Sequence, residues 1–363
     1  MQGRPGGLSF QETAGAVIAR HRPGPPTTSR EGVPPMSHDF VVCVINTRVR
    51  SGKRVFGRAP GPTRFLLVPD GEVQQPAHTV PRAEWVEAVM AAGTTGRDPM
   101  SDNPTGNVLV FIHGYNNSQE IVIKRHRKLK ATLHAAGYRG TVVSFDWPSA
   151  EATLLYMRDR RYAKHTAERL TDDCISLFST RQARGCDLNV HLLGHSTGAY
   201  VIRHAFADAD EVAEIKNRPW KVSQIALIGA DVSSSSLAAD DSRFVSVYRH
   251  CSRLTNYQSG HDGVLRVSNA KRIGLRARAG RVGLPDNAHR KAVNVDCSPY
   301  FAGIDPDSRT PGEDYFGNFA HSWHIGDPLF ARDLCHTLHG ELDRHSIPTR
   351  REEDDRLYLH DPG

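Results

Sequence analysis

The stretch HLLGHSTGAY, residues 191–200, places Ser196 between two glycines, Gly194 and Gly198. The residues before it (LNVHLL) form an apolar run with the length of a strand, and the residues after it (TGAYVIRHAF) carry apolar side chains at helical spacing. Ser196 is therefore predicted at a sharp strand-to-helix turn, which has no room for side chains at the two glycine positions. Such a turn raises the serine hydroxyl above the end of a sheet, although a serine that only caps a helix is compatible with the same residues.

Short apolar runs rich in β-branched residues alternate with segments of helical spacing over most of the chain. The strand-like runs are residues 40–46, 64–69, 107–115, 141–148, 188–193, 224–232, 253–259 and 292–296, and a long helical region covers about 156–182. Near-continuous apolar strands that alternate with helices indicate an α/β fold with a mostly parallel central sheet and helices on both faces. One such domain over residues 37–345 accounts for the order of the runs.

Both ends of the chain differ in composition from this central part. Residues 1–36 are rich in proline, glycine and small polar residues, so we expect a disordered tail that has too few apolar side chains to build a core. Met36 directly precedes the first strand-like run and is a second candidate for the start of translation. Residues 346–363 include the run REEDDRLYLH and are predicted to form a charged C-terminal tail.

The composition argues against several classes of protein. Of the 363 residues, 46 are basic and 40 acidic, and no stretch approaches the roughly 20 apolar residues that span a bilayer. The densest basic run, KRIGLRARAGR (271–281), lacks interleaved aromatic residues, and we interpret it as a solvated surface. We therefore expect neither nucleic acid nor a membrane span, and a small molecule as the partner.

Cysteine and histidine usage predicts no cofactor. The six cysteines lie far apart without a C-x-x-C pair, and the 19 histidines include no H-E-x-x-H. Neither a zinc site nor a disulfide framework follows from these spacings. Reduced thiols are the default in the cytoplasm, and residues 1–36 lack the apolar centre of a secretory signal, so a cytoplasmic protein without metal or organic cofactor is predicted.

The run VLVFIHGYNN, residues 108–117, predicts a second part of the site. In α/β-hydrolases the loop after the third core strand supplies one backbone N–H to an oxyanion hole, and the residue after the nucleophile supplies the other. The corresponding residues here are Tyr115, which follows His113 and Gly114, and Thr197. A plain turn at the end of the strand is the alternative interpretation of the His-Gly-Tyr segment.

The acid and the base are expected after Ser196 in the order Asp, then His, each at the end of a later strand. Asp262 follows the strand-like run 253–259 and is flanked by glycines that allow a turn. Asp231 also follows a strand and is the alternative acid. We favour Asp262 because it comes after the next strand and between turn-forming residues.

Two histidines compete for the role of base. His321 and His324 both lie before a helix that is predicted to begin at Asp327–Pro328. His324 is close enough to this helix to pack against its first turn. His321 follows the small residues of GNFA, which allow the loop to approach the sheet, and it is the favoured base.

Five segments together resemble an uncharacterised bacterial family of α/β-hydrolases, an esterase/lipase-like domain of unknown function. They are VLVFIHGYNNS, VVSFDWPSA, LLGHSTG, YQSGHDGVLRVS and AHSWHIGDP, and the resemblance covers roughly residues 40–340. It implies the α/β-hydrolase fold, with Ser196 as nucleophile, Asp262 as acid and His321 as base. The family commonly has methionine after the nucleophile, whereas this chain has Thr197, which would place a hydroxyl near the acyl pocket.

These residues predict a serine hydrolase that acts on a small-molecule acyl ester. Ser196 would attack the carbonyl of a carboxylic ester or thioester and form an acyl-enzyme, while His321 takes the proton and Asp262 orients the imidazole. An acyltransferase with the same three residues is one alternative. A non-catalytic α/β-hydrolase scaffold that binds a partner is another.

Overall fold

The computed structural model of the protein describes residues 38–149, 156–182, 187–270, 277–304 and 319–363. All of the described residues belong to one compact unit, residues 37–363. The predicted N-terminal tail, residues 1–36, lies outside the described residues.

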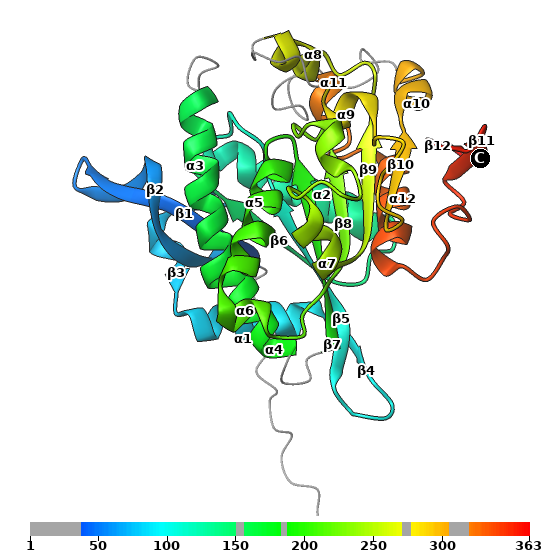
Figure 1. Ribbon diagram of the computed structural model, residues 1–363. Helices are drawn as coiled ribbons and strands as arrows, with labels where there is room; N and C mark the ends of the chain where they lie inside the picture. Colours follow the sequence, from blue (N-terminus) through cyan, green and yellow to red (C-terminus); the bar gives the residue numbers. More distant parts are fainter. Residues whose placement is uncertain (1–37, 150–155, 183–186, 271–276, 305–318) are drawn as a thin grey trace, which may run out of the picture. The chain divides into compact units, whose positions relative to one another are not determined.

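Within the described residues, twelve strands form one sheet in the order β11-β12-β10-β9-β8-β7-β5-β6-β1-β2-β3, with β4 beside β5 (Figure 1). The strands are β1 (His38–Arg50), β2 (Lys53–Pro69), β3 (Thr79–Val80), β4 (Thr94–Arg97), β5 (Pro104–Ile112), β6 (Thr141–Asp146), β7 (Asp187–His195), β8 (Val222–Ile228), β9 (Cys251–Gln258), β10 (Ala292–Asp296), β11 (Arg350–Glu353) and β12 (Arg356–Leu359). Each of the eight strand-like runs of the sequence overlaps one of these strands, although the runs 107–115 and 224–232 extend past the ends of β5 and β8.

The centre of the sheet is parallel and its edges are antiparallel. Parallel pairs connect β1, β6, β5, β7, β8, β9, β10 and β12, while β1–β2, β2–β3, β4–β5 and β11–β12 are antiparallel. The parallel strands are buried on both faces, which is why their sequences are nearly continuous apolar runs; every residue of β6 is buried. The predicted mostly parallel central sheet is confirmed.

Helices cover both faces of this sheet. They are α1 (Arg82–Gly93), α2 (Gln119–Ala135), α3 (Tyr156–Arg169), the π-helical segment η3 (Leu170–Ile175), α4 (Ser176–Gln182), α5 (Gly198–Glu211), α6 (Ala213–Lys216), α7 (Val245–His250), α8 (Gly263–Ala270), α9 (Ala279–Val282), α10 (Ser298–Ala302), α11 (Phe319–Ser322) and α12 (Pro328–His339), with short 3-10 turns η1 (Pro76–His78) and η4 (Ser234–Leu237). The long helical region predicted over 156–182 is thus α3, η3 and α4 in succession.

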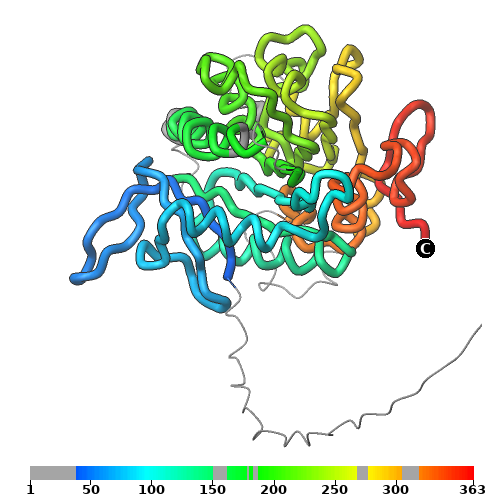
Figure 2. Tube along the Cα trace, turned by 90° about the horizontal axis from the view of Figure 1, so that it is seen from below, coloured from blue at the N-terminus to red at the C-terminus, as the bar shows by residue number. Residues whose placement is uncertain are grey.

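Two large hydrophobic clusters lie on opposite faces of the sheet. One joins α1, α3, α5 and α7 to the sheet and includes Val108 of β5; the other joins α2 and α12 and includes Leu109 and Phe111 of the same strand. Successive residues of a strand point to opposite faces, so one apolar strand supplies both clusters. Seen along the sheet from below, the chain forms a helical layer on either side of the strands (Figure 2).

The carboxyl ends of the parallel strands meet at one edge of the sheet. In Figure 1 this edge is at the top, where α8 and α11 lie side by side above β8 and β9. The helix predicted to begin at Asp327–Pro328 is confirmed as α12. It starts there because the Asp327 side chain caps it, accepting the Phe330 N–H at 2.8 Å, and because proline suits the first helical position.

The prediction of a charged C-terminal tail over residues 346–363 was wrong. The segment supplies β11 and β12, and β12 pairs in parallel with β10. Leu357 and Leu359 are buried on either side of the partly buried Tyr358, while Arg350 donates to the buried carboxylate of Asp333 at 2.6 Å. Charged side chains dominate the composition of this segment, but its alternating leucines and one buried ion pair hold it on the sheet.

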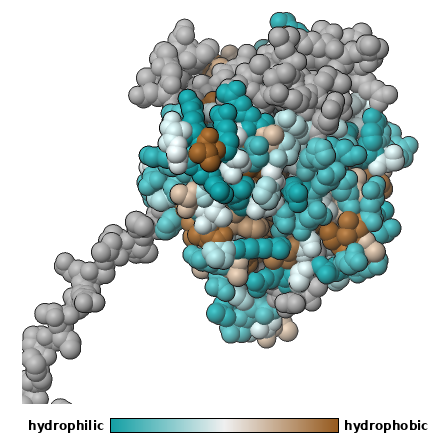
Figure 3. Space-filling model, turned by 90° about the vertical axis from the view of Figure 1, so that its left-hand side faces the viewer, coloured by the Kyte–Doolittle hydropathy of each residue, from teal (hydrophilic) through white to brown (hydrophobic). Residues whose placement is uncertain are grey.

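No helix among the described residues combines the length and the apolar character needed to cross a membrane. On the side of the molecule drawn in Figure 3, hydrophilic residues predominate and hydrophobic ones appear in separate small groups.

Candidate active site

Ser196 lies in the turn between β7 and α5, with a backbone conformation that serine rarely adopts. Its φ angle is +56°, and its side chain is buried. Left-handed backbone is unfavourable for a residue with a side chain and persists only where surrounding contacts impose it. Here the end of β8 imposes it: the Ser196 N–H donates to Ile228 O at 3.0 Å, and the Asp231 N–H donates to Ser196 O at 3.0 Å.

The glycines around this turn are needed because backbones approach closely. A Cβ at Gly198 would lie 2.1 Å from the carbonyl oxygen of Ile112, and a Cβ at Gly114 would lie 2.7 Å from Ser196 Cβ. At Gly194, a Cβ would lie 3.1 Å from the backbone nitrogen of Ala199 on α5. The loop after β5 therefore packs directly against the Ser196 turn.

Asp262 and His321 form a buried pair above the sheet. Asp262 Oδ2 lies 2.6 Å from His321 Nδ1, and Asp262 Oδ1 accepts the Leu265 N–H at 2.9 Å. Because a carboxylate only accepts, the His321 proton sits on Nδ1 and leaves Nε2 as the nitrogen with a lone pair. His321 Nε2 is buried and has no hydrogen-bond partner among the described residues.

His321 is held against the same strand end as Ser196. Its ring covers Gly229, where a Cβ would lie 3.1 Å from His321 Cε1. His195, the residue before Ser196, approaches His321 O with Nε2 at 3.0 Å, and the two rings are 4.8 Å apart. Burial, the largest cause, holds the pKa of His195 well below its ordinary value, so its ring is neutral and its Nε2–H donates.

The side chains of the alternative acid and base have other partners. Asp231 Oδ1 lies 3.2 Å from Arg278 Nε, and both side chains are buried. Arg278 belongs to the basic run that we interpreted as a solvated surface, so that interpretation was wrong at this position. His324 is buried against Trp323, with ring centroids 4.1 Å apart, and burial holds its pKa well below the ordinary value.

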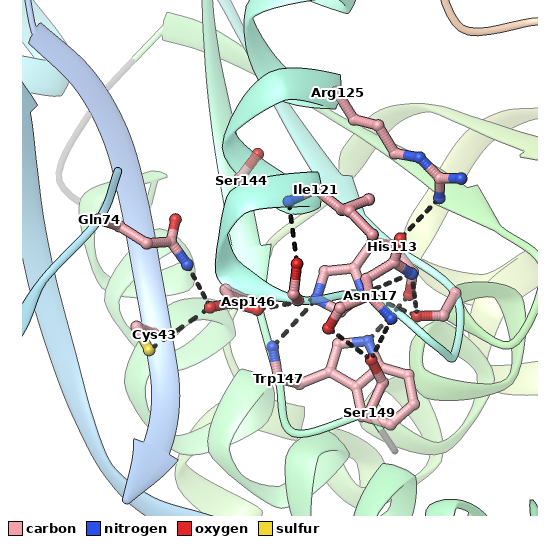
Figure 4. A network of polar contacts seen from close by, with 12 residues as sticks. Cys43, Gln74, His113, Asn117, Ile121, Arg125, Ser144, Asp146, Trp147 and Ser149 are labelled. Carbon is pink, nitrogen blue, oxygen red and sulfur yellow. Dashed lines mark hydrogen bonds and ion pairs between the residues drawn. The ribbon is translucent and has the colours of Figure 1, made fainter. Parts of the chain in front are cut away.

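The loop after β5 is fixed by a network of polar contacts (Figure 4). His113 Nδ1 lies 2.7 Å from Gly114 O, and His113 Nε2 lies 3.0 Å from a carboxylate oxygen of Asp146. Asn117 donates from Nδ2 to Gly114 O at 2.8 Å and to Tyr115 O at 3.0 Å. The backbone of Gly114 and Tyr115 is therefore held from both sides, beside Ser196.

Thr197 is the residue after Ser196 and the N-cap of α5, so its N–H is the first at the start of this helix. The Ala199 N–H already donates to Ser196 O at 3.2 Å, and the Tyr200 N–H donates to Thr197 O at 2.9 Å. The N–H groups of Thr197 and Gly198 precede these bonds, and N–H groups at a helix start lack partners within the helix. They belong to the two residues directly after Ser196, at the end of α5 where the helix dipole favours negative charge.

The sequence profile of one family, described as alpha/beta hydrolase of unknown function (DUF900), matches residues 90–296, more than half of the chain. The chain belongs to this family. The matched region contains Tyr115, Ser196 and Asp262, while His321 follows it. None of the curated proteins matches the sequence.

Several solved hydrolase structures resemble this α/β-hydrolase in part. A carboxyl esterase 2 from Tuber melanosporum is 11% identical, with 86% of this chain and 90% of that chain covered and a TM-score of 0.38. A cutinase-like protein from Cryptococcus sp. is 16% identical, covering 66% of this chain and 95% of that chain with a TM-score of 0.34. A putative hydrolase from Agrobacterium vitis S4 is 10% identical, with 85% of this chain and 100% of that chain covered and a TM-score of 0.32.

Sequence reasoning missed the side chains that support the loop after β5. The segment VVSFDWPSA was part of the family resemblance, but the resemblance did not link it to the loop after β5. In this α/β-hydrolase, Trp147 Nε1 donates to His113 O at 2.8 Å, and Ser149 Oγ accepts the Asn117 N–H at 3.0 Å. The polar residues directly after β5 and β6 were the available signal, because parallel strands end at the same edge of a sheet.

Proposed function

We propose that this protein is a serine hydrolase that cleaves a carboxylic ester or thioester through an acyl-enzyme. Ser196 is the nucleophile, His321 the general base and Asp262 the acid that orients it. The observation that carries the proposal is the 2.6 Å contact between Asp262 and His321 at the strand end that also holds Ser196 in its left-handed conformation. Membership of an α/β-hydrolase family supports it.

The first half of the reaction forms the acyl-enzyme. Ser196 Oγ bonds to the ester carbonyl carbon while its proton passes to His321 Nε2, and the carbonyl oxygen becomes an oxyanion. When the tetrahedral intermediate collapses, the bond to the alcohol or thiol breaks, and this leaving group takes the proton from His321. Water then attacks the carbonyl carbon of the acyl-enzyme and passes a proton to His321 Nε2. When the second tetrahedral intermediate collapses, the bond to Ser196 Oγ breaks, the carboxylic acid is released, and Ser196 Oγ takes the proton from His321.

Asp262 keeps the imidazole in the required tautomer during both halves. Its hydrogen bond holds the proton on Nδ1, so that Nε2 accepts the proton of Ser196. The carboxylate also stabilises the imidazolium that forms next to it. Since Leu265 N–H holds its second oxygen, Asp262 has little freedom to turn away.

The backbone N–H groups of Tyr115 and Thr197 receive the oxyanion in this proposal. Each comes from an element that contacts Ser196 directly: the loop after β5 and the start of α5. Donors held in place before the reaction stabilise the developing charge without reorganisation, and one such donor contributes about 10²–10³ in kcat. No step requires a metal or an organic cofactor.

A panel of p-nitrophenyl esters and acyl thioesters of rising chain length tests the proposal, with Ser196→Ala as the matched control. The wild-type protein should hydrolyse at least one member, and Ser196→Ala should lose several orders of magnitude in kcat without a change in thermal midpoint. Equal turnover by a folded Ser196→Ala protein would disprove the role of this serine. Acyl transfer to an added alcohol faster than hydrolysis would instead identify an acyltransferase.

A further inference from the structure

We propose that Arg125, on α2, is a positioning residue for this reaction: it joins the loop that presents the Tyr115 N–H to the segment that carries His321. The inference rests on the proposed function and adds a role for a side chain outside the three reacting groups. It rests on the two terminal nitrogens of the buried Arg125 guanidinium, Nη1 and Nη2, which we call its two arms. Each arm donates to a different part of the site.

The first arm acts through Asn117. The Asn117 amide donates from Nδ2 to Gly114 O at 2.8 Å. The peptide between Gly114 and Tyr115 is planar and trans, so the Tyr115 N–H points in the direction opposite to Gly114 O. A side chain that fixes this carbonyl oxygen therefore fixes the direction of the N–H that would receive the oxyanion.

Arg125 fixes Asn117 in turn. Its Nη1 donates to Asn117 Oδ1 at 2.8 Å. An asparagine amide has one oxygen that accepts and one nitrogen that donates, and Arg125 only donates. The guanidinium thus holds the amide with Oδ1 toward itself and with Nδ2 toward the carbonyl oxygens of the loop (Figure 4).

The second arm reaches the segment of His321. Arg125 Nη2 donates to Ser322 Oγ at 3.2 Å, and Ser322 is the residue after His321 in α11. A guanidinium is planar, and its N–H groups form a rigid fork. Because both arms belong to one rigid group, Arg125 sets the spacing between the oxyanion loop and the base.

The burial of Arg125 distinguishes it from an ordinary helix arginine. Only 6% of its surface is exposed, and burial lowers the pKa of its guanidinium to about 10, so it is still charged at neutral pH. Burying a charge is costly unless hydrogen bonds satisfy it. Arg127, two residues further along α2, faces another part of the domain and lies 2.6 Å from the carboxylate of Asp39.

The test compares Arg125→Lys with the matched control Arg127→Lys, using an ester that the wild-type protein hydrolyses. A lysine ammonium keeps the charge but is a single point that cannot bond to both Asn117 and Ser322 in the geometry of the fork. We expect Arg125→Lys to lower kcat by about 10- to 100-fold with KM changed less than about twofold, since donors that act on the transition state are displaced. Arg127→Lys should keep kcat within about twofold.

Asn117→Asp and Ser322→Ala separate the two arms with small changes of shape. The aspartate of Asn117→Asp still accepts from Arg125 but no longer donates to Gly114 O. A trifluoromethyl ketone forms a tetrahedral adduct with the serine. The affinity of Asn117→Asp for this ketone should therefore fall in step with its kcat/KM. Affinity for the carboxylic acid product should stay within about twofold. Ser322→Ala removes only the arm toward His321 and should lower kcat by about 3- to 10-fold.

Three outcomes would overturn the inference while leaving the proposed function intact. The first is an Arg125→Lys protein with wild-type kcat. The second is a loss of kcat that Arg127→Lys shares, and the third is an equal loss of affinity for the ketone and for the product; both would indicate a general effect on folding. If the wild-type protein hydrolyses no ester or thioester of the panel, the proposed function fails first and this inference fails with it.

Discussion

Asp262 Oδ2 lies 2.6 Å from His321 Nδ1, and the backbone N–H of Leu265 holds the other carboxylate oxygen at 2.9 Å. Asp262 therefore has two fixed tasks, capping the first turn of α8 and orienting one imidazole. The carboxylate of Asp231, the other candidate acid, forms an ion pair with Arg278. Because of this difference in partners, we expect substitution of Asp262 to lower kcat more than substitution of Asp231.

Asp262→Asn should lower kcat by about 10³–10⁴, because an amide no longer selects the tautomer with the proton on Nδ1. Asp231→Asn, which weakens a contact with Arg278, should lower kcat of the folded protein by less than about tenfold. Steady-state hydrolysis by the two purified variants measures the ranking. A larger loss for Asp231→Asn would move the acid to that residue.

His321→Gln should abolish hydrolysis, since glutamine cannot take the proton from Ser196. His324→Phe keeps an aromatic ring against Trp323 and should retain kcat within about threefold. The comparison requires only matched protein concentrations and circular dichroism spectra that agree with the wild type. If His324→Phe were inactive and His321→Gln active, the base would be three residues further along the chain.

The buried histidines predict a stability that falls in acid. Burial holds the pKa values of His195 and His324 well below the ordinary value and lowers that of His191 to about 3. Below about pH 6.5 the unfolded chain binds protons that the folded protein does not, so the free energy of unfolding decreases by up to about 1.4 kcal/mol per pH unit for each such histidine. Above that pH these three histidines are neutral in both the folded and the unfolded state, so they do not change the free energy of unfolding with pH.

His324→Phe should remove the contribution of one histidine to this loss of stability in acid. Neither ring nitrogen of His324 has a hydrogen-bond partner among the described residues, so phenylalanine loses no polar contact there. Urea unfolding at pH 7 and pH 5 should show a difference about 2 kcal/mol smaller than in the wild type. An unchanged difference would mean that His324 is protonated equally in both states.

Arg350 tests the attachment of the C-terminal strands. Its guanidinium is fully buried against Asp333, so Arg350→Ala leaves a buried carboxylate with hydroxyl donors but without its cationic partner and should cost about 3–5 kcal/mol. Arg351, the next residue, is exposed beside Glu353, and Arg351→Ala should cost less than about 1 kcal/mol. Urea unfolding of the two variants measures both values, and equal losses would contradict the buried pair.

The sequence predicted those features that depend on local patterns. Apolar runs located the parallel strands, and the glycines around Ser196 indicated the turn, because strand burial and close backbone approach restrict the residue types directly. The sequence also named Asp262 and His321 and left Asp231 and His324 open. Which aspartate meets which histidine depends on how loops far apart in the chain come together, and no local pattern encodes that.

The features that escaped sequence reasoning are side chains whose partners are distant. Arg125 is one of several basic residues on an amphipathic helix, and nothing in its neighbours distinguishes it from the surface charges beside it. Arg350 sits in a segment whose composition is that of a solvated tail. In both cases a buried acceptor contributed by another element decides the role of the arginine.

Active-site labelling tests the central claim most directly. The full chain is incubated with a fluorophosphonate, digested, and mapped by mass spectrometry, with Ser196→Ala and heat-denatured protein as controls. We predict one phosphonate adduct on Ser196 of the native protein, slower labelling in Asp262→Asn and His321→Gln, and no adduct in either control. A native protein that stays unlabelled at Ser196, or that reacts equally after denaturation, would contradict the account.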